Sequence, residues 1–340
     1  MKRFLIAILL IICGLTATEK AYAQYYSWGT DPTSFRWRQI KSDKYRIVYP
    51  DTAKNIAPRM ALYLDAVQED IAYGYRHRQM SIPFVVHPAN MQSNGLVMWL
   101  PKRVEFLSSP SISGYSMPWT KQLVAHEYRH AVQYNNLNRG LVKILSYVIG
   151  QQSSTIGLLF MPLWMMEGDA VMSETEMSTF GRGLQPSFSM AYRAYGNVTE
   201  CFPNRDKWFC GSYKDYIPNH YQLGYFICRH GYNRYGRIIG NDMAELTARR
   251  PYMVISNSWV FKKLYGTTQP RLFDDTFNTL HEHWQQMPQI AQSTSAIATP
   301  ETTCYTTYSH PIALDNGAIV ALKEDLDQSS RFVVVDPENG

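Results

Sequence analysis

Apolar and polar residues follow two different rhythms along the first part of the chain. Residues 35–50 alternate around Ser42-Asp43, which predicts a hairpin or two short strands. Residues 53–76 place apolar side chains at helical spacing and predict a helix. A turn at Asn94-Gly95 and a break at Pro101 divide the following segment into short apolar runs. These runs predict strands at residues 82–87, 96–100 and 103–107.

From residue 116 onward the pattern becomes helical. Ser116 followed by Pro118 marks the start of one helix, and Pro162 marks the start of another. Gly181-Arg182-Gly183 is expected to form a flexible loop beyond the second helix. Further helices are predicted at residues 219–232, 238–248, 255–265 and 270–286. This order of elements predicts an α+β fold, in which a small mixed N-terminal sheet lies beside the first helix and a mostly helical subdomain follows.

The composition of the chain changes near residue 289. Residues 289–303 are rich in Ala, Ser, Thr and Pro, which is typical of a linker. Segments 319–322 and 331–335 are strand-like, and residues 336–340 carry a turn signal. We therefore expect residues 304–340 to be the start of a β-rich domain, and the chain to be part of a longer protein.

The pentapeptide His126-Glu127-Tyr128-Arg129-His130 carries the clearest chemical signal. Residues four apart lie on one face of a helix, so His126 and His130 can turn ring nitrogens toward one metal ion. Glu127 points to the side, where it can reach a metal-bound water without binding the metal. The same pattern arises by chance in roughly one chain in a hundred of this composition, as an ordinary helix with two hydrogen-bonded histidines. The metal hypothesis therefore depends on finding a third ligand.

A catalytic zinc ion usually has three protein ligands and leaves its fourth position to water. His130 is not followed by the x-x-G-x-x-H spacing that would supply a third histidine. Glu167 is the best candidate, because it lies on the helix that Pro162 opens and directly precedes Gly168. A glycine at that position lets the helix approach another backbone closely. The predicted site consists of the zinc ligands His126, His130 and Glu167 and the general base Glu127.

Two motifs together resemble a known family. The pentapeptide at 126–130, followed by Pro162-Leu-Trp-Met-Met-Glu167-Gly-Asp-Ala170, resembles the gluzincin metallopeptidases. It is most similar to their peptidase MA-like domains, in which the second motif runs Pro-x-Trp-x-x-Glu-Gly-x-Ala. The resemblance covers roughly residues 35–290 in the order of elements and implies a zincin-like metallopeptidase domain over residues 24–288. Carried over position by position, it implies the same zinc ligands and the same general base.

The resemblance extends to the C-terminal tail, but it does not include the motif of the aminopeptidase branch. The strand-like tail is similar to that of exported bacterial proteins in which such a domain precedes a TolB-like β-propeller. The chain lacks the Gly-x-Met-Glu-Asn string with which the aminopeptidase branch holds a free amine. We therefore expect an endopeptidase.

Several other polar residues are candidates for supporting roles. Asp169 and Glu174 are expected either to orient a ligand histidine through its second ring nitrogen or to lie at the surface. Tyr128 and Arg129 are expected to lie on the surface of the motif helix. Negative charge that develops on a scissile carbonyl oxygen requires a donor beyond the metal. The candidate donors are Tyr221, His220 and Arg182, each of which has ordinary packing or surface placement as its alternative.

The N-terminus predicts export. Lys2 and Arg3 precede an apolar run that is too short to span a bilayer comfortably, and Ala21-Tyr22-Ala23 supplies the small-x-small pattern of a cleavage site. We expect residues 1–23 to be a signal peptide cleaved near Ala23, with lipidation of Cys13 as the alternative. The mature protein would be periplasmic, cell-surface or secreted.

Charge and cysteine content narrow the classes of partner. Cleavage would remove three basic residues and one acidic residue, which lowers the formal net charge from +5 to +3. With no basic run in the chain, this charge gives no reason to expect nucleic acid or an anionic membrane as a partner. Export permits disulfides, and Cys201 and Cys210 bracket a short loop, so we expect these two cysteines to pair.

Residues 141–164 form a markedly apolar stretch that Lys143 and several polar residues interrupt. A transmembrane span is therefore not expected. We predict two helices, or a helix and a hydrophobic loop, that cover the motif helix. The alternative is a patch that faces a membrane or a substrate.

The leading hypothesis is an exported, zinc-dependent metallopeptidase that acts on peptides or proteins. One alternative is a non-catalytic exported scaffold or binding protein derived from a peptidase domain, and another is zinc-dependent hydrolysis of a non-peptide amide. The sequence leaves the oligomeric state and the substrate preference open.

Overall fold

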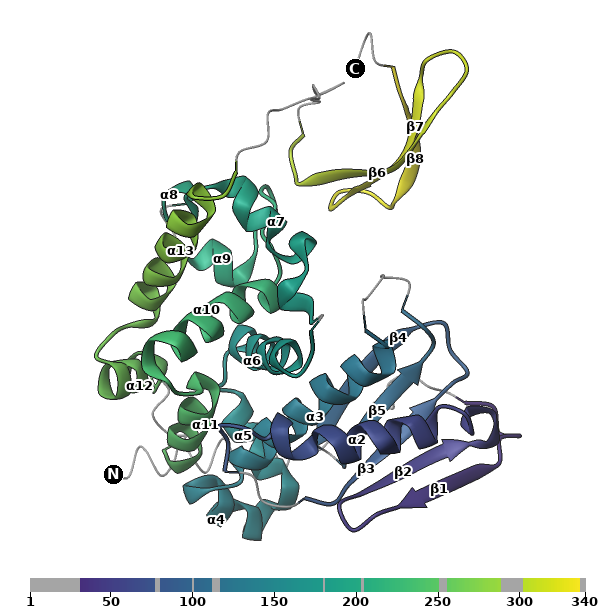
Figure 1. Ribbon diagram of the computed structural model, residues 1–340, viewed down its shortest axis with the longest axis vertical. Helices are drawn as coiled ribbons and strands as arrows, with labels where there is room; N and C mark the ends of the chain where they lie inside the picture. The colour runs from purple at the N-terminus through teal and green to yellow at the C-terminus, as the bar shows by residue number, and fades with distance from the viewer. Residues whose placement is uncertain are drawn as a thin grey trace, which may run out of the picture.

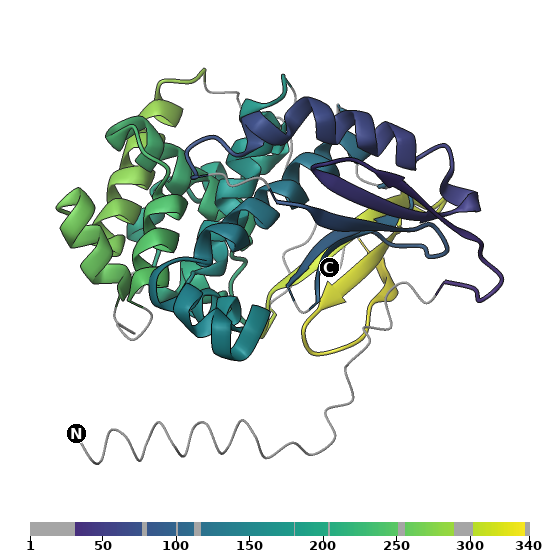
Figure 2. The ribbon, with the colours of Figure 1, turned by 90° about the horizontal axis from the view of Figure 1, so that it is seen from below.

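The chain folds into a five-stranded sheet, a series of helices and a three-stranded sheet, in that order along the sequence (Figure 1). A computed structural model describes residues 31–76, 80–99, 101–111, 117–179, 181–202, 205–250, 256–288 and 302–336. Figure 2 shows the molecule from below, with the N-terminal sheet on one side and most of the helices on the other. The predicted α+β class, with a small mixed sheet followed by helices, is confirmed.

The N-terminal sheet is mixed, with the strand order β1-β2-β3-β5-β4. The outer pairs β1–β2 and β4–β5 are antiparallel, whereas β2–β3 and β3–β5 are parallel, so β4 forms one edge. The strands are β1 (Trp37–Lys41), β2 (Tyr45–Pro50), β3 (Ile82–His87), β4 (Ser93–Trp99) and β5 (Lys102–Ser108). A parallel pair needs a long crossover. Helix α2 (Ala57–Ile71) provides it between β2 and β3, after the short 3-10 turn η1 (Asp51–Ala53).

Two helices cover one face of this sheet. Helix α2 packs against β1 and β2, the motif helix α3 (Trp119–Leu137) packs against β4 and β5, and the two helices contact each other. Phe84 and Phe106, on neighbouring strands, stack with their ring centroids 5.7 Å apart and are fully buried, as is Ile47 on β2. The apolar contact between sheet and helices fixes α3 against the strand edge.

The predicted turn at Asn94-Gly95 is wrong. Both residues lie inside β4, where Asn94 pairs with Leu107 and Gly95 pairs with Phe106. The chain reverses instead between Trp99 and Lys102, which pair with each other at the end of the hairpin. A glycine in a strand can mark a close approach of another group rather than a turn, and Gly95 is such a case.

The helices that follow α3 form the larger part of the molecule. Helix α3 begins after Pro118, and the expected cap Ser116 lies outside the described residues. Of the segment Gly181-Arg182-Gly183, expected as a loop, the last two residues enter the 3-10 turn η3 (Arg182–Leu184), where Gly181 packs on Thr175 of α6 and Gly183 on Tyr225 of α10. The other helices are α4 (Gly140–Ile149), α5 (Ser153–Leu158), α6 (Leu163–Glu176), α7 (Pro186–Tyr195), α8 (Val198–Cys201), α9 (Asp206–Cys210), α10 (His220–Tyr235), α11 (Ile239–Arg249), α12 (Ser256–Tyr265) and α13 (Gln269–Gln285), with the 3-10 turn η2 (Gly150–Gln152) between α4 and α5.

The apolar stretch 141–164 forms two helices, α4 and α5, as predicted, but only α5 packs on the motif helix. Helix α5 contacts the C-terminal end of α3, where Gly157 approaches Leu137. Helix α4 packs on α5 and α11 and leaves most of its apolar side chains exposed.

Helices α6 and α10 cross at two glycines. A Cβ atom added to Gly168 would lie 2.0 Å from the backbone of Gly224, and one added to Gly224 would lie 1.7 Å from the carbonyl oxygen of Trp164. No other residue fits at either position without moving a backbone. The close approach expected from Gly168 is therefore present, and it fixes the position of α6 within the helical part.

The strands β6 (Thr306–Ala313), β7 (Ile319–Asp325) and β8 (Arg331–Val335) form an antiparallel sheet. Strand β6 was not predicted, because a register shift between Ser309 and Ile312 interrupts its alternation. Tyr305, just before β6, donates its backbone N–H to the carbonyl of Tyr213, 3.0 Å away. Residues 289–301 of the expected linker lie outside the described residues.

The expected disulfide between Cys201 and Cys210 is absent. All four described cysteines are free. Cys201 ends α8 and directs its thiol to the carbonyl oxygen of Tyr195, 3.3 Å away, whereas Cys210 is exposed at the end of α9. Each cysteine ends a separate short helix, so nearness in the sequence does not make the two sulfur atoms face each other.

Candidate metal centre

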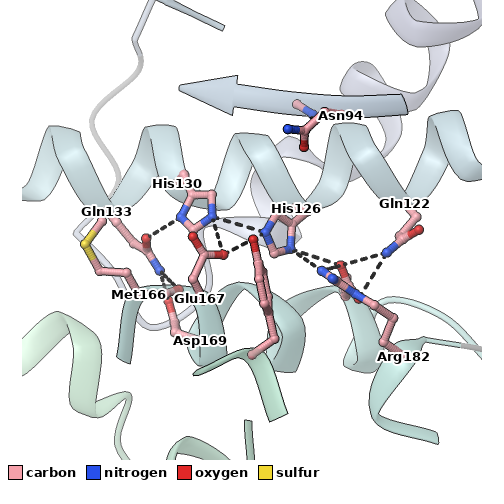
Figure 3. A network of polar contacts seen from close by, with 12 residues as sticks. Asn94, Gln122, His126, His130, Gln133, Met166, Glu167, Asp169 and Arg182 are labelled. Atoms are coloured by element: carbon pink, nitrogen blue, oxygen red, sulfur yellow. Dashed lines mark hydrogen bonds and ion pairs between the residues drawn. The ribbon is translucent and has the colours of Figure 1, made fainter. Parts of the chain in front are cut away.

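The motif helix α3 buries its polar face against α6. Residues 126–130 are all buried, and the helix turns the two histidine rings toward Glu167 on α6 (Figure 3). This position results from packing on both sides, because the sheet supports α3 and the crossing of Gly168 with Gly224 supports α6. The two predicted motifs therefore meet at one helix–helix contact.

Three ligand atoms converge on one point. Nε2 of His126 and Nε2 of His130 lie 3.1 Å apart, and Oε2 of Glu167 lies 3.2 Å from the first and 3.1 Å from the second. In a tetrahedral zinc site, with bonds of about 2.0–2.1 Å, neighbouring ligand atoms lie about 3.3 Å apart. The spacing of these donors therefore fits a zinc ion, and among the described residues this is the group that could hold a metal.

The tautomer of His130 is fixed by Gln133. The side-chain N–H groups of Gln133 donate to the carbonyl of Met166 and to Asp169, at 2.9 and 2.7 Å. Its Oε1 atom must therefore accept, and it lies 2.8 Å from Nδ1 of His130. The proton is thus on Nδ1, and the lone pair on Nε2 is available to a metal.

Glu174 performs the corresponding role for His126. Its Oε2 atom lies 3.0 Å from Nδ1 of His126, and the carboxylate also accepts from Arg182 and, at 3.4 Å, from Gln122. The guanidinium of Arg182 lies 2.8 Å from the same Nδ1 atom. A carboxylate opposite Nδ1 favours the tautomer that leaves Nε2 free to bind a cation. Glu174 is fully buried, so its expected alternative, surface exposure, is wrong.

Asp169 supports the histidines only indirectly. It accepts from Gln133 and, through both oxygens, from Arg129 at 2.7 and 2.8 Å, and it accepts from Tyr75 at 3.0 Å. Arg129 also donates to the carbonyls of Ile71 and Tyr73, at 2.5 and 2.8 Å, at the end of α2. Asp169 touches no histidine ring, so it supports His130 only through Gln133. It lies neither at the surface nor directly on a ligand.

Arg129 and Tyr128 are both buried, which corrects their expected surface placement. A buried arginine is costly unless it is paired and fully hydrogen-bonded. Here the guanidinium pairs with Asp169 and closes the C-terminal end of α2. The bulky middle of the motif therefore ties α3 to α2 and α6.

The electrostatics of the cluster favour a bound positive charge. Burial lowers the pKa of His130, but the charge and hydrogen bond of Glu167 outweigh burial and raise that pKa to about 9. The pKa of His126 is also raised, because its hydrogen bonds to the carboxylates of Glu167 and Glu174 outweigh burial and the charge of Arg182. Burial acts to raise the pKa of Glu167, yet the two histidines hold it below its usual range. Without a metal, these groups bind protons instead.

Glu127 lines the same cleft as His126, His130 and Glu167. Burial raises the pKa of its carboxyl, which brings it closer to neutral pH. It lies directly against Gly95 of β4, where an added Cβ atom would be 2.4 Å from its Cγ. Gly95 is thus required for the close approach of the edge strand to Glu127.

A cleft runs between β4 and the metal centre. Its walls come from the edge strand, from α3, from the start of α6 and from η3 and α10, and it is open to solvent beside Leu163. The residues that line it include Ser93, Asn94, Gly95, Leu96, Val97, Gln122, Glu127, Leu163, Arg182 and Tyr221. Two oxyanion candidates, Tyr221 and Arg182, therefore line the cleft.

Tyr221 lies beside His126 and carries a phenol that can donate a hydrogen bond. Its ring centroid is 6.1 Å from that of His126, and the Arg182 guanidinium lies 5.1 Å from its ring centre. Burial and the negative charge of Glu167 raise the pKa of its phenol, so it stays protonated and able to donate at neutral pH. His220 stacks on Tyr221, with ring centroids 4.6 Å apart, and does not line the cleft. The guanidinium of Arg182 already donates to Glu174 and lies against Nδ1 of His126.

The sequence prediction missed three contributors to this site: Gln122, Gln133 and Gly95. Gln122 precedes His126 by four residues and Gln133 follows His130 by three, so helical spacing alone would have placed each beside its histidine. The part played by Gly95 depends on a contact between distant segments, and no local pattern shows it.

No protein-family model matches the chain, and no curated protein matches it. Among solved structures, an aminopeptidase N family protein from Idiomarina loihiensis is similar, with a TM-score of 0.40 and 13% sequence identity. The match covers 72% of this chain and 46% of that protein, so the chain spans less than half the length of the protein it matches. The evidence for a metal centre is therefore the geometry of this chain's own residues.

Proposed function

We propose that the protein is a zinc-dependent metallopeptidase. The observation that carries this proposal is the convergence of three lone-pair donors, from His126, His130 and Glu167, beside the buried carboxyl of Glu127. Both histidine rings have an acceptor opposite Nδ1, and this arrangement serves a cation at Nε2. An ordinary pair of satisfied core histidines would not leave both Nε2 atoms facing a carboxylate.

Zinc bound there would lower the pKa of a coordinated water to about 7 and polarise a substrate carbonyl. Glu127 then removes the proton of the attacking water and later delivers it to the leaving amine. Its raised pKa suits both transfers, because the protonated and ionised forms lie closer in free energy near neutral pH. Tyr221 is a phenol donor beside the ligands and would stabilise negative charge on the carbonyl oxygen.

The edge strand β4 supports a peptide as the substrate. Among the described strands none pairs with its outer edge, and residues 93–97 line the cleft. An extended peptide can pair with such an edge through main-chain hydrogen bonds. Gly95 lies opposite Glu127, so the strand continues for two lining residues on either side of the catalytic carboxyl. A peptide could therefore extend past the scissile bond in both directions, which favours endopeptidase activity.

Metal analysis combined with cleavage of a mixed peptide library tests the proposal. The purified protein should contain close to one zinc per chain and cleave internal bonds. Glu127→Gln should retain the zinc and lose about 10²–10⁴-fold in kcat/KM. Glu167→Gln should lose zinc affinity, whereas Glu176→Gln, at the exposed end of the same helix, should change neither property. Unchanged cleavage by Glu127→Gln would exclude the mechanism.

Two alternatives predict different results in the same assay. A non-catalytic scaffold would bind zinc in wild type and cleave nothing. A hydrolase for non-peptide amides would leave the peptide library intact and, with Glu127 unchanged, cleave small acyl-amide probes.

We also propose that the protein is exported and cleaved near Ala23. The basic residues, the apolar run and the Ala21-Tyr22-Ala23 pattern support this, and they lie outside the described residues. Mass spectrometry of the protein recovered from an expressing bacterium should give an N-terminus at Gln24. A chain that stays inside the cell with Met1 intact would overturn the proposal.

A further inference from the structure

Helix α4 exposes apolar side chains that a helix of its composition normally buries. Seven of its ten residues are apolar, and only Val142 is buried. Ile144, Tyr147 and Val148 are 62%, 79% and 83% exposed. These three positions follow helical spacing, so they form one stripe on the solvent side of the helix. A stripe of this kind on a folded protein indicates an interaction surface.

The exposed apolar surface continues along the chain toward the cleft. Leu159, which follows α5, is 76% exposed, and Leu163, at the start of α6, is 56% exposed and lines the cleft. We call the exposed residues of α4 together with Leu159 and Leu163 the apolar face. Leu163 of this face lies at the rim of the cleft, and α4 lies at the end of the molecule opposite β6–β8 (Figure 1).

The charges around the apolar face are mostly positive. The sequence contains no Asp or Glu between Glu127 and Glu167, whereas Lys143 lies on α4 and Arg139 lies just before it. On the neighbouring α11, Glu245 is paired with both Arg139 and Arg249. Lys102, in the hairpin whose backbone contacts Gln151 of η2, adds a further cation. The face thus combines exposed apolar side chains with a basic border.

This combination fits an anionic lipid surface. An amphipathic helix in the interface plane inserts its apolar side chains among the acyl chains and places lysine and arginine at the headgroups. Tyr147 is an aromatic residue with a polar end, which suits the same boundary. A symmetric dimer through this face would instead bring Lys143 and its basic neighbours against their own copies. Charge complementarity therefore favours the lipid.

Contact at the membrane surface agrees with the helix lengths better than a span does. Within the described residues no single helix is long and apolar enough to cross a membrane. The pair Gly140–Leu158 and Leu163–Glu176 passes the same test jointly, with a bend of 87°. Its second member carries Glu167 and is buried in the fold, so it is not available to lipid.

We propose that the apolar face docks the protein on an anionic membrane surface, with the mouth of the cleft beside the bilayer. This inference does not depend on the proposed peptidase activity. Docked in this way, the cleft would receive polypeptide that lies close to a membrane.

Flotation with lipid vesicles tests the docking. The probe is phosphatidylcholine vesicles with and without about one-third phosphatidylglycerol. The protein is used as exported by the expressing cell, with the same N-terminus verified in every variant by mass spectrometry. Wild type should float with the anionic vesicles, and less so as salt is increased. Ile144→Ser/Val148→Ser should weaken the binding by about tenfold or more.

A control variant and a charge variant show whether binding depends on this face and on its positive charge. Phe332→Ser/Val334→Ser removes two apolar side chains of similar exposure from β8 and should leave vesicle binding unchanged. Lys143→Gln should weaken binding to the anionic vesicles by about fivefold or less. Equal flotation of wild type and the Ile144→Ser/Val148→Ser variant would overturn the inference. So would a wild-type dimer, seen by sedimentation, that this variant dissociates while neither protein binds vesicles.

Discussion

Helices α3 and α4 follow each other in the chain and distribute their residues in opposite ways. Helix α3 buries charged and polar side chains, among them His126, Glu127 and Arg129. Helix α4 is mostly apolar and leaves Ile144, Tyr147 and Val148 in solvent. Each helix therefore departs from the usual rule that apolar residues lie inside and charged residues outside.

The two departures have different physical consequences. A buried charge on α3 destabilises the fold unless each polar atom has a partner, so the site requires matched residues on α2 and α6. An exposed apolar residue on α4 costs the folded state almost nothing, because it is exposed in the unfolded chain as well. Substitutions on α3 should therefore alter stability and metal binding, whereas those at the exposed positions of α4 should alter only what the surface binds.

The largest effect is expected at Asp169. Asp169→Asn keeps the shape of the side chain but leaves the buried guanidinium of Arg129 without a counter-charge. Removing one partner of a buried pair costs about 3–5 kcal/mol. We expect urea denaturation to show a loss of this size.

The control for this substitution is an exposed ion pair. Asp275→Asn removes the carboxylate opposite Arg234, where the two side chains are 40% and 53% exposed, and should cost about 0–1 kcal/mol. If the two variants are equally stable, the burial on α3 is not what holds α2, α3 and α6 together.

Local pattern predicted the three residues that converge, but the supporting residues depended on tertiary contacts. Helical spacing indicates His126 and His130, and a second motif indicates Glu167. The roles of Arg129 and Gly95 could not be read from the sequence, because their partners lie at the end of α2 and on α3. Asn94-Gly95 is a strong local turn signal, yet pairing with β5 and the approach of Glu127 outweighed it.

The metal-free protein should lose stability as the pH rises. The folded-state pKa of His130 is raised to about 9, above its unfolded value of about 6.5. Its contribution is therefore fully present below pH 6.5 and is lost as the pH rises toward 9, by about 3 kcal/mol. Urea denaturation with a chelator present should show this loss, and saturating zinc should remove most of it because the metal replaces the proton.

Two histidine variants show which residue causes this loss of stability with rising pH. His130→Gln should flatten the dependence of stability on pH. His230→Gln should preserve it, because burial and Arg234 lower the pKa of His230, so that its own contribution to stability changes only below about pH 6.5. A chelated wild type whose stability does not change between pH 6.5 and 9 would contradict the electrostatics of the cluster.

A smaller effect is expected where α6 crosses α10. Gly168→Ala forces a methyl group into the backbone of Gly224, so the helices must separate and carry Glu167 away from the histidines. We expect about 1–3 kcal/mol of destabilisation and a loss of zinc affinity. Gly231→Ala on α10 meets only the flexible end of the Ile239 side chain and should retain normal zinc affinity. Equal zinc affinities in the two variants would show that the crossing does not position the ligand.

The smallest effect should come from the apolar face, and it tests the comparison of α3 and α4 directly. Val132 on α3 is 1% exposed and Val148 on α4 is 83% exposed, so the same substitution can be made in both settings. Val132→Ser buries a hydroxyl and leaves a cavity, and it should cost about 2 kcal/mol or more. Val148→Ser should change the free energy of unfolding by less than about 0.5 kcal/mol, since the side chain is in water before and after unfolding. A large loss in Val148→Ser would mean that α4 is covered within the molecule or by a second copy. A negligible loss, together with weaker vesicle flotation, would assign the apolar face to an external partner and leave α3 as the element on which the fold and the metal centre both depend.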